Sequence, residues 1–180
     1  ICAGASARSL AFSCRRAGLR PATCDLFFDS DLAEHCPGVR IPAGSWPAGL
    51  LDGIEQLPAL PVIYSGGLEN HPGLIRRLEE RHEIIGNGSA VLEKTLDPFA
   101  VSSCLAGTGL RVPEIRQPGE ELPMDPDWLS KPIRSGGGLG IESAAEAETS
   151  EGRYLQRFVD GVPASALFLA GKNGSTHQAL

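Results

Sequence analysis

Through residues 1–90, short apolar segments with strand character alternate with segments of helical periodicity. The expected strands are Ile1–Ala3, Pro21–Cys24, Val39–Ile41, Leu60–Tyr64 and Glu83–Ile85, and the expected helices are Ala7–Ala17, Ser30–His35, Gly49–Leu57 and Pro72–Arg81. The last helix is the clearest, because Leu74, Ile75 and Leu78 recur on one face. Alternation of this kind predicts a mostly parallel sheet covered by helices.

From about Asn87 onward the pattern changes. We expect helices at Ser89–Thr95, Pro98–Ala106 and, short and acidic, Ser143–Ser150, and strands at Asp127–Lys131, Arg153–Val159 and Val162–Ala170, the last turning at Gly171–Gly174 into a final strand. Strands joined by short turns indicate antiparallel pairing. The chain is therefore expected to combine a parallel sheet with a second, antiparallel one.

Charge and cysteine content limit the partners and the compartment. The 180 residues carry a net charge of −6, with a pI near 5.2, which disfavours a nucleic-acid partner. No apolar run approaches the roughly 18 residues that a membrane span needs, so no membrane partner is expected. The five cysteines are an odd number, widely spaced and without a C-x-x-C pair, which predicts free thiols and a cytoplasmic protein.

One segment carries the chemistry. An apolar strand delivers Lys131, a proline follows, and then comes the glycine-rich run Ser135-Gly136-Gly137-Gly138-Leu-Gly140. Glycines let a loop bring bare N–H groups against an anion, and a nearby ammonium can reach the same phosphate oxygens. The run is not a Walker loop, because no G-x-x-x-x-G-K occurs. A phosphate cradle and a plain hairpin loop with a solvated lysine both remain open at this point.

Two further elements flank this loop in the sequence. Lys94 stands on an expected helix ahead of it, and the extended segment Tyr154-Leu-Gln-Arg-Phe-Val-Asp-Gly161 follows it. Together the ordered set resembles the ATP-grasp superfamily of carboxylate–amine ligases. Lys94 with the later Gly109-Leu-Arg-Val-Pro113 looks like that family's first nucleotide-binding lysine and its G-x-x-x-P segment. Lys131-Pro with the glycine run is similar to the family's K-P strand and glycine loop.

The resemblance implies a fold and a site. The fold is α/β, with a Rossmann-like parallel-sheet domain at residues 1–88 followed by a partial α+β ATP-grasp domain at residues 89–180. Lys94 and Lys131 would neutralise phosphate charge, and the backbone of Ser135, Gly136, Gly137 and Gly138 would close over the β- and γ-phosphates. Gln156, Arg157, Phe158 and Val159 would lie along the adenine, with Phe158 or Leu155 as an apolar wall.

The resemblance also implies an activity. Such enzymes are ATP-dependent, ADP-forming ligases that activate a carboxylate as an acyl phosphate, which an amine then attacks. The implied partners are a small-molecule carboxylate and amine, and the implied cofactors are ATP and Mg²⁺. The style of the first half is similar to ligases that add an amino acid such as glutamate in one-carbon cofactor synthesis.

The sequence departs from the family pattern in two places. Arg157 stands where the family usually has glutamate, and an arginine cannot accept the same hydrogen bond. No acidic strand residue with a Glu-x-Asn pair follows Gly171, so no metal ligand and no catalytic residue is named. The chain also starts at Ile1 and stops at Leu180, inside apparent strands. We expect a piece of a longer protein, with Mg²⁺ ligands beyond residue 180 and little activity of its own.

Alternatives remain open. The chain could be an ATP-binding module without ligase activity, or an NAD(P)-dependent oxidoreductase in which Asp25 holds a ribose, although no G-x-G-x-x-G follows the first strand. The segment Tyr64–His71 follows a strand and precedes a helix. It is either a ligand-binding loop or a glycine turn whose Asn70 caps the next helix.

Overall fold

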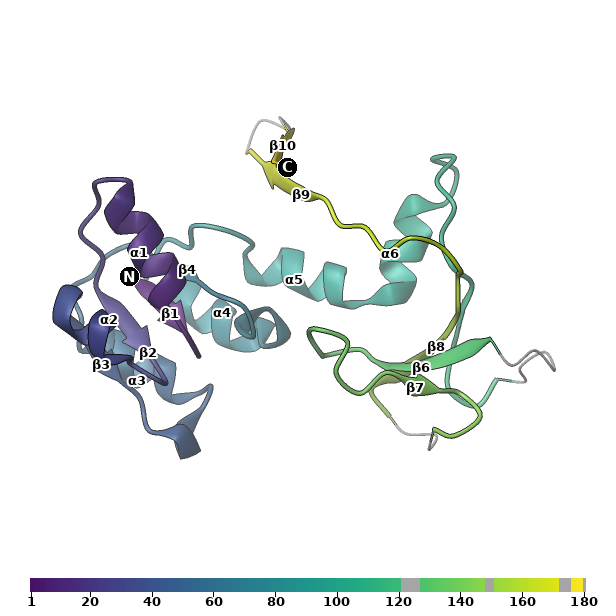
Figure 1. Cartoon of the computed structure of the whole chain (residues 1–180), viewed down its shortest axis with the longest axis horizontal. Coiled ribbons are helices and arrows are strands. Elements are labelled where there is room, and N and C mark those ends of the chain that lie inside the picture. Colours follow the sequence, from purple (N-terminus) through teal and green to yellow (C-terminus); the bar gives the residue numbers. More distant parts are fainter. Residues whose placement is uncertain (121–126, 148–150, 172–175, 180) are drawn as a thin grey trace.

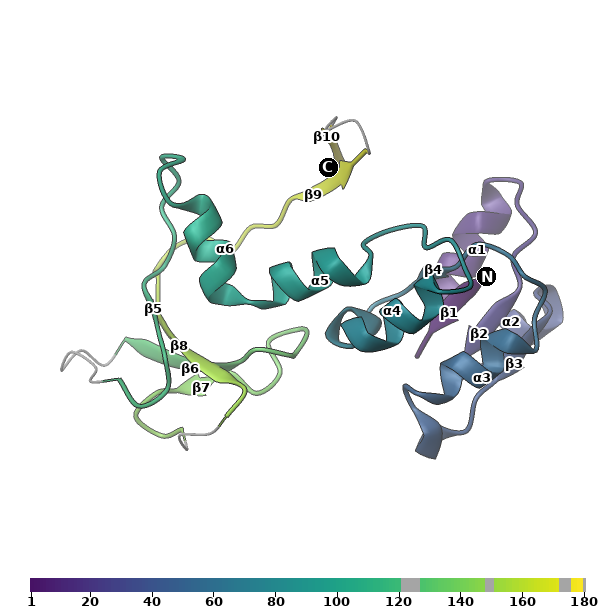
Figure 2. The ribbon, with the colours of Figure 1, turned by 180° about the vertical axis from the view of Figure 1, so that it is seen from behind.

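The computed structural model describes residues 1–120, 127–147, 151–171 and 176–179. A parallel sheet with its helices forms one end of the molecule, and an antiparallel sheet forms the other (Figure 1). Helix α5 (Ser89–Leu96) lies between the two sheets and α6 (Pro98–Leu105) lies over the antiparallel one, as the view from behind also shows (Figure 2). The predicted α/β class is confirmed.

The parallel sheet contains strands from residues far apart in the chain. Its strands are β1 (Cys2–Gly4), β2 (Thr23–Asp25), β3 (Gly38–Arg40) and β4 (Ile63–Tyr64), in the order β3-β2-β1-β4. Its helices are α1 (Arg8–Arg16), α2 (Ser30–His35), α3 (Gly49–Glu55) and α4 (Pro72–Glu79), with short 3₁₀ turns at Ala43–Ser45 and Leu68–Asn70. Every pairing in this sheet is parallel, as predicted. The expected strand at Glu83–Ile85 is reduced to one parallel bridge, between Val62 and Ile84.

Helices cover both faces of this sheet, and neighbouring residues of a strand point to opposite faces. Ala3 packs in a cluster with residues of α3 and α4, while Cys2 packs with residues of α1 and α2. The first cluster is the larger and includes Leu50, Ile54, Val62, Leu68, Ile75 and Leu78. Alternate residues of β1 therefore enter different clusters, which explains why Cys2 and Ala3 are both buried.

One glycine allows α3 to approach the sheet closely. A Cβ added to Gly53 would lie 2.6 Å from Sγ of Cys24 on β2 and 3.0 Å from a methyl carbon of Ile41. A glycine inside a helix is normally unfavourable by about 1 kcal/mol relative to alanine. Here the missing side chain makes room for the strand, which explains its place in the helix.

Burial suppresses the reactivity of two thiols in this core and gives a testable prediction. Burial raises the pKa of Cys2 and Cys24 to about 12, so at pH 8 only about one thiol in ten thousand is ionised. Cys104 is exposed on α6. A short iodoacetamide pulse on the folded protein should therefore label Cys104 first and leave Cys2 and Cys24 unlabelled, as read by peptide mass spectrometry. All five cysteines should react in denaturant; equal labelling of Cys24 and Cys104 in the folded protein would contradict the burial argument.

The antiparallel sheet comprises β5 (Ile115–Arg116), β6 (Trp128–Pro132), β7 (Glu142–Ser143) and β8 (Arg153–Arg157), in the order β5-β8-β6-β7. Its antiparallel pairing was predicted. The acidic helix expected at Ser143–Ser150 is wrong over the part that the structure describes. Residues 142–143 pair with β6 and residues 144–147 form a turn, while residues 148–150 lie outside the described residues. Pairing with the strand satisfies the backbone groups that a helix would otherwise have satisfied.

Helix α5 contacts the first core. Leu92 is buried in the cluster that contains Ile75, and the carboxylate of Glu79 accepts hydrogen bonds from the backbone N–H and hydroxyl of Ser89. Asp97 then begins α6 by accepting from the N–H groups of Phe99 and Ala100. The domain boundary at residue 88 stays a prediction. Helix α5 follows it in the sequence and packs against the core of the residues before it.

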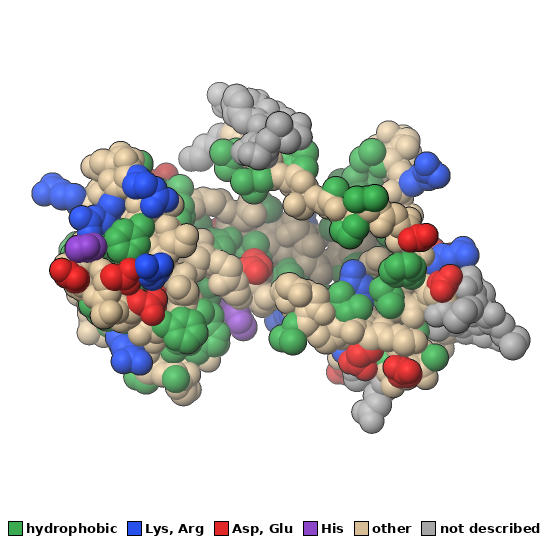
Figure 3. Space-filling model, viewed as in Figure 1, with side chains coloured by type: hydrophobic (Ala, Val, Ile, Leu, Met, Phe, Trp, Pro, Cys, Tyr) green, Lys and Arg blue, Asp and Glu red, His purple; other side chains and the backbone are tan. Residues whose placement is uncertain are grey.

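The last described segment stands apart from both sheets. Strand β9 (Leu167–Ala170) pairs in antiparallel register with β10 (Thr176–Ala179), and the strand expected from Val162 begins only at Leu167. The turn expected at Gly171–Gly174 lies outside the described residues after Gly171. Side chains of β9 such as Phe168 are exposed, and hydrophobic atoms gather there in the space-filling view (Figure 3). No helix in the described part of the chain has both the length and the apolar character of a membrane span.

Candidate functional site

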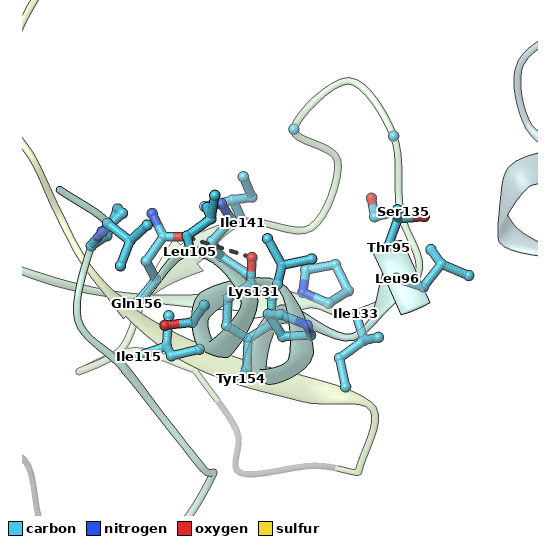
Figure 4. Close-up of a pocket in the computed structure, with 18 of the residues that line it drawn as sticks. Thr95, Leu96, Leu105, Ile115, Lys131, Ile133, Ser135, Ile141, Tyr154 and Gln156 are labelled. Carbon is cyan, nitrogen blue, oxygen red and sulfur yellow. Dashed lines mark hydrogen bonds between the residues drawn. The ribbon is translucent and has the colours of Figure 1, made fainter. Parts of the chain in front are cut away.

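A cavity of about 510 Å³ lies between helices α5 and α6 and the antiparallel sheet. Its volume is in the range of pockets that hold small organic ligands. The lining residues are Thr95, Leu96, Pro98, Val101, Ser102, Leu105, Val112, Pro113, Ile115, Lys131, Pro132, Ile133, Ser135, Gly136, Gly137, Gly138, Ile141, Tyr154 and Gln156. Apolar walls therefore surround a small set of polar groups, and the labelled side chains come from both helices and the sheet (Figure 4).

The strand register brings the polar groups together. Lys131 on β6 lies opposite Tyr154 on β8, and Leu129 lies opposite Gln156. Alternate residues of a strand share a face, so Lys131, Tyr154 and Gln156 all face the cavity. Nζ of Lys131 donates to Oε1 of Gln156 over 3.1 Å and lies 5.7 Å from the centroid of the Tyr154 ring (Figure 4). The half-buried ammonium is thus held at a defined place without a carboxylate partner among the described residues.

The glycine loop forms one rim of the cavity. Gly137 and Gly138 have φ angles of +63° and +78°, a region that L side chains rarely adopt. A Cβ at Gly136 or Gly137 would meet no atom within 4 Å, so the loop opens onto free space. The hydroxyl of Ser135 donates to the carbonyl of Leu139 over 2.6 Å, which closes the loop on itself. Glycine is needed here for the backbone turn and for access, not for packing.

The structure brings together six of the ten residues named from the sequence. Lys131, Ser135, Gly136, Gly137, Gly138 and Gln156 line the cavity. Lys94, Arg157, Phe158 and Val159 do not, and all four are exposed. Lys94 immediately precedes the lining residue Thr95, and Arg157 immediately follows the lining residue Gln156.

The apolar wall comes from residues that the sequence argument did not name. Leu96, Val101 and Leu105 supply it from the helices, whereas Leu155 lies on the strand face opposite the cavity. The spacing Leu96, Val101, Leu105 is an apolar pattern that could have been noticed, but nothing in it specifies which surface it covers. Tyr154, two residues before Gln156, could have been found from the period of the strand.

The loop after β4 is built mainly from its own contacts. The hydroxyl of Ser65 donates to the carbonyl of Ser6 over 3.0 Å, and the N–H of Gly67 donates to the Glu69 carboxylate. The capping role considered for Asn70 is wrong, because His71 occupies the cap position of α4 and no side chain caps it. Oδ1 of Asn70 is buried without a partner among the described residues.

Tyr64, which opens that loop, is tied to the start of the second region. Its hydroxyl donates to the carbonyl of Asn87 over 2.7 Å. Burial raises the pKa of Tyr64, and the carboxylates of Glu69 and Glu79 raise it further. The group is therefore a neutral hydrogen-bond donor at physiological pH, with a structural partner.

Asp25 is a structural residue. Its carboxylate is fully buried and accepts from the backbone N–H groups of Ala7 and Phe28. Both oxygens are engaged by the chain, so the carboxylate is not presented to a ribose as the dinucleotide alternative required. Asp25 instead ties together the loops that follow β1 and β2.

Within the described ranges, no group of three or more His, Cys, Asp or Glu side chains is arranged to hold a metal ion. The cavity itself presents lysine, amide, hydroxyl and backbone groups, which suit an anion better than a divalent cation. The expectation of Mg²⁺ ligands beyond residue 180 stays a prediction.

No family model matches the sequence, and no curated protein is a significant match to it. Solved structures do match. N5-carboxyaminoimidazole ribonucleotide synthetase from Thermus thermophilus is 22% identical with a TM-score of 0.66, covering 98% of this chain and 52% of that one. The ADP complex of an enzyme of the same name is 19% identical, also with a TM-score of 0.66, covering 98% of this chain and 51% of that one.

A structure from Archaeoglobus fulgidus, described as an ATP-grasp superfamily protein, is 17% identical with a TM-score of 0.62, covering 93% of this chain and 49% of that one. The chain spans about half the length of the solved structures that it matches. At these identities the likeness concerns the fold. The predicted α/β fold is confirmed: over the half that it spans, this chain has the same fold as these solved structures.

Proposed function

We propose that this chain is the nucleotide-binding part of an ATP-dependent carboxylate–amine ligase, with a Rossmann-like domain at residues 1–88 and a partial ATP-grasp domain at residues 89–180. The observation that carries the proposal is the position of Lys131. Its ammonium lies in an apolar-walled cavity beside an open glycine loop. A lysine in such a place, paired only with a neutral amide among the described residues, suits a phosphate group.

The cavity residues divide the work of holding ATP. The ammonium of Lys131 would turn from Gln156 toward phosphate oxygens, and the N–H groups of Gly136–Gly138 would close over them. The apolar side chains of Leu96, Val101 and Leu105 would cover the base and exclude water. Once Lys131 turns away, the side-chain amide of Gln156 would be free both to accept from the ligand through Oε1 and to donate to it through its N–H groups.

The exposed residues complete the proposed set. Lys94 would reach the phosphates from the end of α5, and Arg157, Phe158 and Val159 would lie along the base where β8 ends. Lys94 and Arg157 adjoin the lining residues Thr95 and Gln156 in the sequence, and Phe158 and Val159 follow Arg157 directly. A ligand extending past the cavity would therefore meet them.

The proposed reaction has two steps. A carboxylate oxygen attacks the γ-phosphorus and the bond to ADP breaks, which gives an acyl phosphate; an amine then attacks the acyl carbon and phosphate leaves. In such a transfer the protein mainly positions groups and stabilises charge, and Mg²⁺ supplies part of that stabilisation when bound. The amine proposed from the sequence is an amino acid in one-carbon cofactor synthesis. The likeness to N5-carboxyaminoimidazole ribonucleotide synthetases favours an aminoimidazole ribonucleotide as a second candidate.

Nucleotide binding is tested by thermal unfolding with and without ligand. At a concentration of 100 times Kd, a ligand stabilises the folded state by about 2.7 kcal/mol, which raises Tm by roughly 5–10 °C for a chain of this size. We expect that rise with ATP and Mg²⁺ and none with NAD⁺ or NADP⁺ at equal concentration. Stabilisation by a dinucleotide alone would contradict the proposal and favour the oxidoreductase alternative.

Ligase activity is tested separately, by the release of ADP. Release that depends on both an added carboxylate and an added amine supports the ligase. Binding of ATP without any such release, across amino acids and aminoimidazole ribonucleotide, supports the alternative of a non-catalytic ATP-binding module.

A further inference from the structure

Arg153, the first residue of β8, makes several side-chain hydrogen bonds around the glycine loop. Nε donates to the hydroxyl of Ser130 over 2.7 Å, and Nη2 donates to the carbonyl of Ser130 over 3.0 Å. Nη2 also donates to the carbonyl of Gly140 over 2.8 Å and lies 3.3 Å from the Glu142 carboxylate. The side chain is only 16% exposed, and Ser130 is 3% exposed.

These contacts connect the glycine loop to the two strands that flank it. Ser130 belongs to β6 before the loop, Gly140 is at the end of the loop, and Glu142 begins β7 after it. The Nε and Nη2 groups of a guanidinium lie in one plane and carry three N–H groups, so a single side chain can reach acceptors from all three parts. The end of the loop is therefore held to the strand that precedes it.

The rest of the loop has no comparable restraint. A Cβ on Gly136 or Gly137 would meet nothing within 4 Å, whereas one on Gly140 would lie 3.4 Å from Pro132. The backbone N–H of Leu139 donates to Gly136, and that of Ile141 donates to Gly138, both within the loop itself. The loop is therefore open to the cavity at Gly136 and Gly137 and is held by side-chain contacts at Gly140.

We propose that Arg153 is a positioning residue, which sets the glycine loop over the phosphate end of the cavity by holding the carbonyl of Gly140. The part that concerns phosphate rests on the function proposed above. Arg153 lies outside the cavity lining, so it acts through the loop and not on the ligand. Its removal should weaken the recognition of phosphates and leave the apolar part of the site intact.

The first test needs no nucleotide. In the free protein, Arg153→Met should make the amides of Leu139 and Ile141 exchange hydrogen about tenfold faster, because their bonds depend on the anchored loop. Glu142→Gln should leave their exchange within about twofold of the natural protein, since the Glu142 contact is the longest of the four and its side chain is 48% exposed. Unchanged exchange in Arg153→Met would overturn the anchoring role, whatever the protein binds.

The second test compares ADP with adenosine by calorimetry. Arg153→Met should weaken ADP binding about tenfold and adenosine binding less than twofold, and Arg153→Lys should recover part of the loss because it keeps one charged donor. Ser130→Ala is the matched structural control. It removes the Nε acceptor but leaves the Gly140 contact, so it should lower Tm without changing the ratio of the two affinities.

The outcomes separate the two proposals. Equal losses for ADP and adenosine, or the same altered ratio in Ser130→Ala, would overturn the positioning role and leave Arg153 as strand packing. If the natural protein bound neither ligand, the proposed nucleotide site would fail. The exchange measurement would still decide whether Arg153 anchors the loop.

Discussion

Replacing Lys131 with methionine should weaken ATP binding by about 10- to 100-fold, because a hydrogen bond to a charged group contributes about 1.5–3 kcal/mol and each 1.4 kcal/mol is tenfold in affinity. Methionine keeps most of the apolar stem and removes the ammonium, so the cavity retains its shape. Lys131 already donates to Gln156 in the free protein, and binding breaks that bond. The net gain from the phosphate contact is therefore smaller, which favours a loss of affinity nearer tenfold. Titration calorimetry with ATP and Mg²⁺ measures the change.

The matched control is Arg134→Met, which removes an exposed cation three residues further along that does not line the cavity. Because salt screens an exposed charge that lies outside the cavity, this variant should change ATP affinity less than about twofold. If both variants lost affinity equally, the effect would be one of net charge. Native affinity in Lys131→Met would remove Lys131 from the phosphate site.

Replacing Asp25 with alanine should lower the free energy of unfolding by about 3 kcal/mol, since two backbone N–H groups, that of Ala7 buried and that of Phe28 partly buried, would each lose a bond to a charged acceptor. For a chain of this size that corresponds to a fall in Tm of roughly 6–12 °C. Asp25→Asn should cost less, because its amide keeps one oxygen that can accept from Ala7 or Phe28. Urea or thermal unfolding followed by circular dichroism measures these differences.

Asp52→Ala is the control for that series. Asp52 is exposed in the first turn of α3, where a carboxylate contributes only a few tenths of a kcal/mol through the helix dipole, so its Tm should move by about 1–2 °C. A loss below about 1 kcal/mol in Asp25→Ala would mean that water replaces the carboxylate, and that Asp25 is not what joins the loops after β1 and β2.

Elements with a strong local pattern were predictable. The apolar stripe of α4, the glycine after α1 and the short apolar strands all act over a few residues, so the sequence contains their cause. The glycine loop was predictable for the same reason, because positive φ angles at Gly137 and Gly138 favour glycine whatever surrounds them. Local chemistry also located Lys131 beside that loop.

Features that depend on distant partners were not predictable. The sequence could not indicate that the Asp25 carboxylate accepts from the N–H groups of Ala7 and Phe28, because these groups meet only when the loops after β1 and β2 pack together. Asn70 was a reasonable cap by residue type, yet the backbone began α4 one residue later. Residues 142–143 have no strong strand pattern and became a strand only because β6 offered free hydrogen-bonding groups.

Three features follow from the amino-acid sequence alone: the alternation of strands and helices, the parallel and antiparallel halves, and the lysine before a glycine loop. These follow from spacing, glycine conformation and side-chain type, which are properties of neighbouring residues. The apolar wall of the cavity, made by Leu96, Val101 and Leu105, and the link that Arg153 makes between Ser130 and Gly140 depend instead on how distant elements pack. Those contacts join residues from separate elements, and such contacts exist only after the strands have paired and the helices have packed.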